Sequence, residues 1–166
     1  MCRVSPEKKG LLRAWIAAHA PGNSAPLFAA GAPSYQLTPE AVALLKRPSD
    51  GVEMKLYVVC LGEPEREAAV AYVGKSADPW ARWSGGHLRN LRLAAKGAKR
   101  SAYARWVRLF ESADKTVHLV CVGERGIGFP PIPRFPGNVG SVEYQLVSLA
   151  HDCYPEYLLN REGVAR

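Results

Sequence analysis

Two apolar segments that each carry a tyrosine, followed at once by a helix-start signal, constrain the fold of this chain most strongly. Residues 54–61 and 68–74 are rich in β-branched and aromatic side chains, and a Gly-Glu-Pro-Glu sequence lies between them. This pattern predicts two strands joined in a hairpin. Pro79 follows two residues that favour helix N-caps, Ser76 and Asp78. We therefore expect a helix to begin there, capped by Ser76 or Asp78, directly after the second strand.

Further along the chain, the hydrophobic pattern predicts more helices and one more strand. We expect Gly85 and Gly86 to interrupt or end the helix that starts at Pro79. The remaining expected elements are helices at 87–99, 101–110 and 142–151, a strand at 116–123, and a Gly- and Pro-rich loop at 124–141. The order of these elements predicts an α/β fold with a small, mostly antiparallel, three-stranded sheet flanked by helices.

Residues 1–52 are expected to form a helical N-terminal extension that precedes the main domain. Helix-start signals, in which a serine or threonine is followed by Pro-Glu, occur at Ser5 and at Thr38. Between the two expected helices, residues 21–36 are rich in Ala, Pro, Gly and Ser, so we expect a loop there.

Composition limits the classes of function. The chain has 166 residues, 48% of them hydrophobic, which is enough for one domain with a packed core. Its net charge of +7 favours polyanionic partners, although an ordinary basic protein has the same balance. No apolar run reaches the roughly 18 residues that span a bilayer, and the N-terminus lacks the apolar core of a signal peptide. The four cysteines form no Cys-x-x-Cys pair. We therefore expect a cytoplasmic protein with reduced thiols and no membrane contact.

Four widely spaced polar side chains together suit the hydrolysis of a phosphodiester. Tyr57 and Tyr72 lie in the two expected strands, Arg82 lies in the helix that follows, and Glu143 lies in an apolar helix far downstream. A guanidinium is a bidentate ligand for phosphate oxygens, and a carboxylate with phosphate oxygens and water can hold Mg²⁺ or Mn²⁺. Either tyrosine can orient or deprotonate the attacking water if Lys75 and the metal lower its pKa. Each residue alone has a plain structural explanation, so the hypothesis depends on their order and spacing.

This order and spacing resemble the GIY-YIG nuclease family. Lys55-Leu56-Tyr57 stands where that family has its first motif, and only the tyrosine of that motif is retained. Tyr72-Val73-Gly74, followed by Lys75-Ser76, is similar to the second motif in the restriction-endonuclease branch. Arg82 resembles the helix arginine of the family, and Glu143 resembles its metal-binding glutamate.

Two further residues extend the resemblance, which covers about residues 54–160. Asn160 is similar to the family's late asparagine. His87 resembles a histidine that often follows the arginine by one helical turn, but here it lies five residues after Arg82 and beyond two glycines. The resemblance implies that residues 53–166 form the nuclease domain.

The resemblance also implies roles for the site residues. Tyr57 is expected to be the general base, supported by Tyr72 and Lys75. Asn160 is expected to position the glutamate region or the loop around it.

Basic side chains that follow the helix expected to begin at Pro79 are candidates for nucleic-acid contacts, although a solvated helical face explains them equally well. The expected contacts are Arg89, Arg92, Lys96, Lys99, Arg100 and Arg105, with Arg108 in the same stretch and Arg125 and Arg134 in the long loop.

The sequence thus predicts a metal-dependent DNA endonuclease that acts on double-stranded DNA. A sequence-specific restriction-type enzyme is its most specific form, and a homodimer on DNA is one arrangement that it allows. Two alternatives stay open. One is a non-catalytic nucleic-acid-binding module on the same scaffold, and the other is a structure-specific or repair nuclease.

Overall fold

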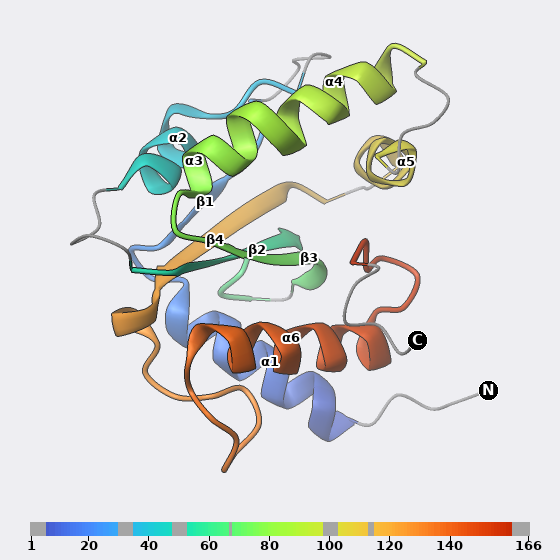
Figure 1. The fold of residues 1–166 in the computed structure, drawn as a ribbon. Coiled ribbons are helices and arrows are strands. Elements are labelled where there is room, and N and C mark those ends of the chain that lie inside the picture. Colours follow the sequence, from blue (N-terminus) through green and yellow to red (C-terminus); the bar gives the residue numbers. More distant parts are fainter. Residues whose placement is uncertain are drawn as a thin grey trace.

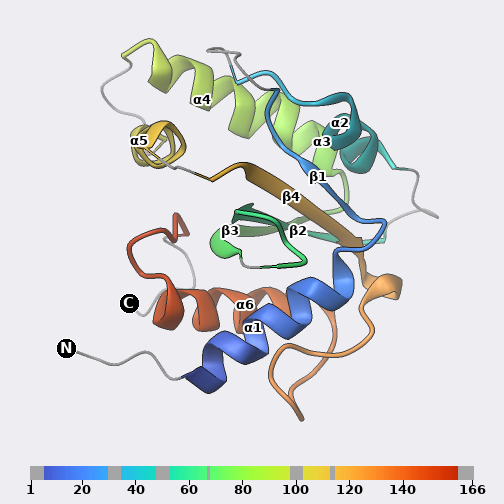
Figure 2. The same ribbon diagram turned by 180° about the vertical axis from the view of Figure 1, so that it is seen from behind.

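A four-stranded antiparallel sheet lies between two layers of helices (Figures 1 and 2). The computed structural model describes residues 6–29, 35–47, 53–66, 68–97, 103–112 and 115–160. Its strands are β1 (Ser24–Pro26), β2 (Lys55–Leu61), β3 (Ala69–Ser76) and β4 (Val117–Gly123), in the spatial order β1-β4-β2-β3. The α/β class and the antiparallel pairing are confirmed, whereas the expectation of three strands is wrong.

The fourth strand comes from the N-terminal extension. β1 pairs with β4, with Ser24 opposite Val120 and Pro26 opposite His118. Three residues in an Ala- and Pro-rich stretch carry no strand pattern, which is why this segment was expected to be a loop. Proline lacks an N–H group, and it is tolerated here because β1 is an edge strand.

The two expected helices of the extension are present and cover opposite faces of the sheet. They are α1 (Pro6–His19) and α2 (Pro39–Lys46). Thr38 caps α2, since its hydroxyl accepts a hydrogen bond from the Ala41 N–H at 3.0 Å. The extension therefore contributes a strand and two helices to the same layered body as the rest of the chain.

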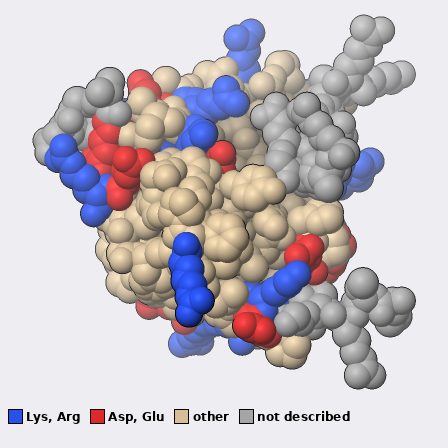
Figure 3. All heavy atoms as spheres, turned by 60° about the horizontal axis from the view of Figure 1, so that its bottom comes forward, with Lys and Arg blue, Asp and Glu red and all other residues tan. Residues whose placement is uncertain are grey.

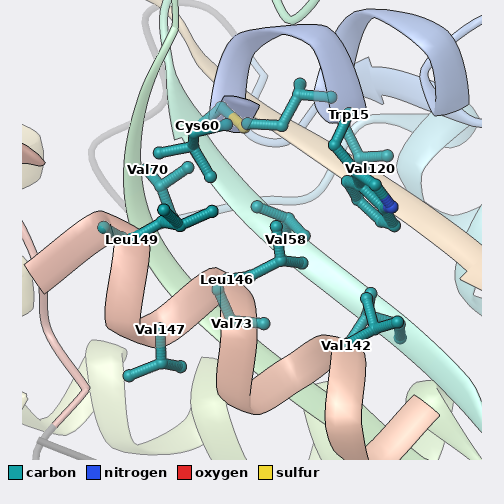
Figure 4. Close-up of a cluster of buried hydrophobic side chains, with 14 of the residues drawn as sticks. Trp15, Val58, Cys60, Val70, Val73, Val120, Val142, Leu146, Val147 and Leu149 are labelled. Atoms are coloured by element: carbon teal, nitrogen blue, oxygen red, sulfur yellow. The ribbon is translucent and has the colours of Figure 1, made fainter. Parts of the chain in front are cut away.

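One layer consists of α1 and α6 (Val139–Cys153), which pack on the face formed by alternate residues of the central strands. Figure 4 shows Leu146 of α6 next to Val58 of β2 and Leu149 of α6 next to Val70 of β3, in one buried cluster that also contains Val142. Trp15 of α1, which is fully buried, fills the same cluster.

The other layer consists of α2, α3 (Pro79–Arg82), η1 (Trp83–His87), α4 (Leu88–Ala95) and α5 (Ala104–Ser112). It covers the opposite side chains of the strands, so Tyr57 and Leu119 pack with Trp83 and Leu91. Since strand side chains alternate between faces, Tyr57 points away from α6 while its neighbour Val58 points toward it.

The pair of glycines after Arg82 does not break the helix. Residues 79–95 are continuous, because Gly85 and Gly86 lie in a π-helical turn in which the Leu88 N–H bonds to the carbonyl of Trp83. A π turn takes up one extra residue, so side chains five apart fall on the same face. Arg82 and His87 therefore project from one side of the helix.

Helix α6 begins earlier than expected. Asn138 is its N-cap and accepts a hydrogen bond from the Ser141 N–H at 2.9 Å. Glu143 is consequently the fifth residue of the helix, whereas the expected range of 142–151 makes it the second. No helix among the described residues is long and apolar enough to cross a membrane.

Candidate active site

A cleft runs along the open edge of β3, where the two helical layers approach each other. Its volume is about 520 Å³. Tyr72, Gly74 and Lys75 line it from β3, Glu143 and Tyr144 from α6. The other lining residues are Tyr57, Val73, Arg82, Tyr103, Arg105, Trp106, Gly140, Val147, Leu159 and Asn160. Of the seven residues expected to be catalytic, only His87 is absent from the lining, and it lies directly behind Tyr57.

Tyr57 reaches this cleft across Gly74. Tyr57 belongs to β2, an interior strand, and its antiparallel partner on β3 is Gly74. A Cβ atom on Gly74 would lie 2.5 Å from two ring carbons of Tyr57 and 2.6 Å from its hydroxyl oxygen. The ring therefore occupies the space that any side chain at position 74 would need. This explains in physical terms why a glycine ends the Tyr-Val-Gly sequence.

The Tyr57 hydroxyl meets one basic group and one imidazole. It hydrogen-bonds with the Arg82 guanidinium, and it lies 3.2 Å from His87 Nε2. Burial raises the pKa of Tyr57 above its ordinary value, and the neighbouring Tyr72 adds to the rise, whereas Arg82 opposes it. In the free protein Tyr57 is therefore a protonated phenol at neutral pH. Added positive charge in the cleft is required before it can accept a proton.

Tyr72 stands beside Tyr57 on the same face of the sheet, with their ring centroids 6.2 Å apart. Tyr72 also packs on Trp106, at a centroid distance of 4.7 Å. A β-bulge precedes it, because the pairing of β2 with β3 skips Ala71. Such bulges re-aim the following side chains, and this one directs Tyr72 toward the cleft.

Glu143 and Lys75 face each other across the cleft floor. Their Oε1 and Nζ atoms are 3.7 Å apart, and their side chains are 26% and 42% exposed. No group of three or more His, Cys, Asp or Glu side chains among the described residues is arranged to hold a metal ion. The single carboxylate suits only a cation such as Mg²⁺, which keeps several waters and takes further ligands from substrate phosphates.

Asn160 completes the edge of the sheet. Its Oδ1 accepts a hydrogen bond from the Val73 N–H at 2.8 Å, and its Nδ2 donates to the Val73 carbonyl at 2.7 Å. The Leu159 N–H also donates to the Ala71 carbonyl at 2.7 Å. The segment around Leu159 and Asn160 thus pairs with β3 as a short strand would, and it fixes the backbone between Tyr72 and Gly74.

His87 is 2% exposed and makes hydrogen bonds through both ring nitrogens. Burial lowers the pKa of His87 to about 4, and the charge of Arg82 contributes to the shift. The imidazole is therefore neutral at neutral pH, and its second partner is the Tyr103 hydroxyl at 2.8 Å.

The basic residues expected to contact nucleic acid lie in different places. Arg105 lines the cleft and donates to the Leu158 carbonyl at 3.3 Å. Arg89 and Arg92 are exposed on α4 and Lys96 is exposed at its C-cap, all outside the cleft lining. Lys99 and Arg100 lie outside the described residues. On the face seen in Figure 3, uncharged side chains occupy the centre and scattered Lys, Arg, Asp and Glu side chains surround them.

The long loop before α6 is anchored to both α1 and α6. The Trp15 Nε1–H donates to the Phe129 carbonyl at 2.9 Å, and the Gly128 N–H donates to His19 Nε2 at 3.0 Å. Gln145, which is buried, accepts from the Ile132 N–H at 3.0 Å. Arg134 is exposed at the outer part of this loop and has a positive φ of 72°. Arg125 and Arg108 are exposed as well.

Sequence reasoning missed two tyrosines of the cleft. Tyr103 immediately precedes α5 and lies within the segment 101–110 that is expected to be a helix, where its hydroxyl carries no sequence signal of its own. Tyr144 is 64% exposed, and its position directly after Glu143 was the signal that the sequence offered for it.

Comparison with known proteins adds no relative. No family model, curated protein or solved structure matches this chain.

Proposed function

We propose that this protein is a metal-dependent endonuclease that hydrolyses phosphodiester bonds in DNA. The observation that carries the proposal is the gathering of Tyr57, Arg82 and Glu143 around one cleft, although they lie far apart in the sequence. Lys75 and Asn160 line the same cleft. The resemblance to the GIY-YIG family predicts a similar set of residues.

In this proposal, the scissile phosphate occupies the cleft between the two helical layers. Arg82 is exposed and already bonded to Tyr57, so its remaining N–H groups are placed to bind phosphate oxygens beside the phenol. Developing negative charge on the phosphorane is stabilised by this guanidinium and by Lys75. Tyr57 takes the proton of the attacking water after its own deprotonation.

Glu143 would hold the divalent cation together with phosphate oxygens and water, and the cation would supply the additional positive charge that the transition state and the Tyr57 phenolate require. Lys75 lies within ion-pair distance of the same carboxylate. In the resting protein this lysine neutralises Glu143, and on binding it is free to turn toward the phosphate.

A non-catalytic nucleic-acid-binding module is the second candidate. Three features favour it: Tyr57 is buried, its pKa is raised, and Lys75 pairs with Glu143. With these features, Tyr57 is protonated and Glu143 is already neutralised by Lys75. A sequence-specific restriction enzyme and a repair nuclease are finer forms of the first candidate, and both would use the same cleft.

Incubation of supercoiled plasmid with the protein and Mg²⁺ tests the proposal. We expect nicked or linear products from the wild type, none from Glu143→Gln, and equal DNA binding by both. Glu156→Gln is the matched control, because Glu156 is exposed and does not line the cleft. Binding without cleavage by the wild type, with Mg²⁺ or Mn²⁺ and on linear, supercoiled and branched DNA, would instead support the binding module.

A further inference from the structure

A continuous line of hydrogen bonds joins the buried Tyr57 to Tyr103, a residue that neither the sequence pattern nor the proposed function assigns. Tyr57 Oη lies 3.2 Å from His87 Nε2, and His87 Nδ1 lies 2.8 Å from Tyr103 Oη. Tyr57 and His87 are almost completely buried, whereas Tyr103 is half-buried and lines the cleft. The three side chains come from β2, the π turn and the residue just before α5, so the tertiary fold brings them together.

The neutral imidazole at the centre of this line has two tautomers, and in each of them both ring nitrogens have a hydrogen-bond partner. With the hydrogen on Nδ1, His87 donates to Tyr103 and accepts from the Tyr57 hydroxyl through Nε2. With the hydrogen on Nε2, His87 donates to the Tyr57 oxygen and accepts from the Tyr103 hydroxyl through Nδ1. A hydroxyl serves both states because it can donate and accept, whereas a backbone carbonyl would lock the ring in one tautomer.

We propose that Tyr57, His87 and Tyr103 form a proton relay in which Tyr103 is the outer member and carries the proton from Tyr57 to the water of the cleft. The relay rests on the proposed function, because it produces the phenolate that this function requires. It acts when a phosphate and its cation lie against Tyr57 and cover the direct path to solvent.

The proton transfers balance along the line. Tyr57 passes its proton to Nε2, Nδ1 passes its proton to the Tyr103 oxygen, and Tyr103 releases its own proton to water. Tyr57 loses one proton, water gains one, and the imidazole stays neutral while its hydrogen moves from Nδ1 to Nε2. The Tyr57 phenolate then accepts hydrogen bonds from Arg82 and from the Nε2–H of His87. The reverse sequence restores the resting state.

The groups that face this line from the neighbouring elements are few among the described residues. Arg82 lies on the same helix as His87, and Tyr72 of β3 packs near the rings of Tyr57 and His87. The negative charge of Glu143 in α6 opposes deprotonation of Tyr57. Burial raises the pKa of Tyr103, and the charge of Arg82 and a hydrogen bond with Asn90 oppose that rise. Tyr103 therefore stays a neutral hydroxyl, which can accept the proton from Nδ1 while it releases its own to water.

Two changes at position 103 test the relay with opposite expected effects. Tyr103→Phe removes the hydroxyl, so the part of the pH–rate profile that reports deprotonation of Tyr57 should move to higher pH, and single-turnover cleavage near neutral pH should slow at least about tenfold. Incorporation of 3-fluorotyrosine at position 103 retains the hydroxyl and makes it a stronger donor, so the same part of the profile should move to lower pH. DNA affinity should stay unchanged in both proteins.

The matched control is Tyr157→Phe, which removes the hydroxyl of an exposed tyrosine that does not line the cleft. It should leave the profile in place. A purely structural role of Tyr103 predicts slower cleavage by the Phe variant but no shift with fluorotyrosine, whose fold is retained. An unshifted profile with fluorotyrosine therefore overturns the relay.

Nitrogen-15 NMR of the His87 ring provides a test that does not need cleavage. Fluorotyrosine at position 103 should move the ring toward the Nε2–H tautomer, and Tyr103→Phe should change the Nδ1 resonance. If the wild type does not cut DNA but these shifts occur, the proposed function fails while the hydrogen-bonded line stands. If the ring nitrogens do not respond to either change, the relay is overturned, whatever the protein cuts.

Discussion

Gly74 of β3 lies opposite Tyr57 of β2, and the Tyr57 ring lies over the place where a Cβ atom of residue 74 would be, 2.5 Å from it. An interior strand thereby presents its side chain at the edge of the sheet. The relationship links two motifs that are separate in the sequence, because the glycine of the second motif makes room for the tyrosine of the first.

Gly74→Ala should therefore displace the Tyr57 ring from the cleft. We expect cleavage to fall by at least about a hundredfold, as for loss of a general base, and the free energy of unfolding to decrease by about 1–3 kcal/mol from overpacking. Gly140→Ala is the matched control in the same cleft, since its Cβ would meet Lys75 Nζ at an ordinary 3.5 Å. Plasmid nicking and urea unfolding measure the two effects. Equal activity of both alanine variants would show that the position of the Tyr57 ring is not critical.

Arg82 tests the need for a planar guanidinium beside the phenol. Arg82→Ala should slow single-turnover cleavage by about a hundredfold or more, the scale for loss of one transition-state charge donor. Arg82→Lys should restore little, because an ammonium group cannot bind Tyr57 and two phosphate oxygens in one plane. If the lysine variant cuts as fast as the wild type, Arg82 supplies only general positive charge.

Substitutions of Asn160 test whether the segment around this residue stabilises the edge of β3. Asn160→Ala removes both hydrogen bonds to Val73, so the free energy of unfolding should fall by about 1–3 kcal/mol, at roughly 0.5–1.5 kcal/mol for each bond. Asn160→Asp keeps the acceptor for the Val73 N–H and loses only the donor. Hydrogen exchange of the Val73 amide should therefore accelerate strongly in the alanine variant and weakly in the aspartate variant. Equal exchange rates in the two variants would contradict the observed pairing.

His87 makes stability depend on pH. Its pKa is about 4 in the folded protein against an ordinary value of 6.5, so the unfolded chain binds more protons between these values. The contribution of His87 to the free energy of unfolding is therefore fully present above pH 6.5. It is lost as the pH falls toward 4, by about 3 kcal/mol in total. Denaturant unfolding at several pH values should show this slope in the wild type and in His151→Gln, whose histidine is exposed. The slope should be smaller in His87→Asn, and an unchanged slope would mean that His87 is not the residue responsible.

Much of the fold could be predicted from local patterns. The hairpin of β2 and β3 and the start of α3 at Pro79 follow from β-branched runs and from the Asp78 cap, both of which are local in sequence. β1 could not be predicted, because three residues have too little periodicity and the pairing with β4 is entirely long-range. The π turn at Gly85 and Gly86 could not be predicted either, since two consecutive glycines ordinarily indicate the end of a helix.

For the candidate site, sequence order could suggest the residue types but not their contacts. Tyr57, Arg82 and Glu143 were selected by spacing, and the structure places all three at one cleft. The closeness of Gly74 to the Tyr57 ring depends on strand register, and the contact of Tyr103 with His87 depends on how α5 packs. Neither relationship has a periodic signal in the sequence. The π turn also explains how a histidine five residues after Arg82 shares its face.

Salt dependence tests how the protein holds DNA. If phosphate contacts dominate, the logarithm of affinity should fall linearly with the logarithm of salt concentration, with a slope of about −0.9 for each phosphate contacted. Arg89 is exposed on α4 and Lys96 is exposed at its C-cap. Their joint replacement by Ala should make the slope shallower by roughly one to two units and weaken binding to all sequences alike. Replacement of Arg66 and Lys115 by Ala removes the same charge from exposed positions on other elements and is the matched control. Because long-range attraction depends on net charge while counterion release depends on local contacts, equal changes in the two double variants would exclude α4 as the DNA surface.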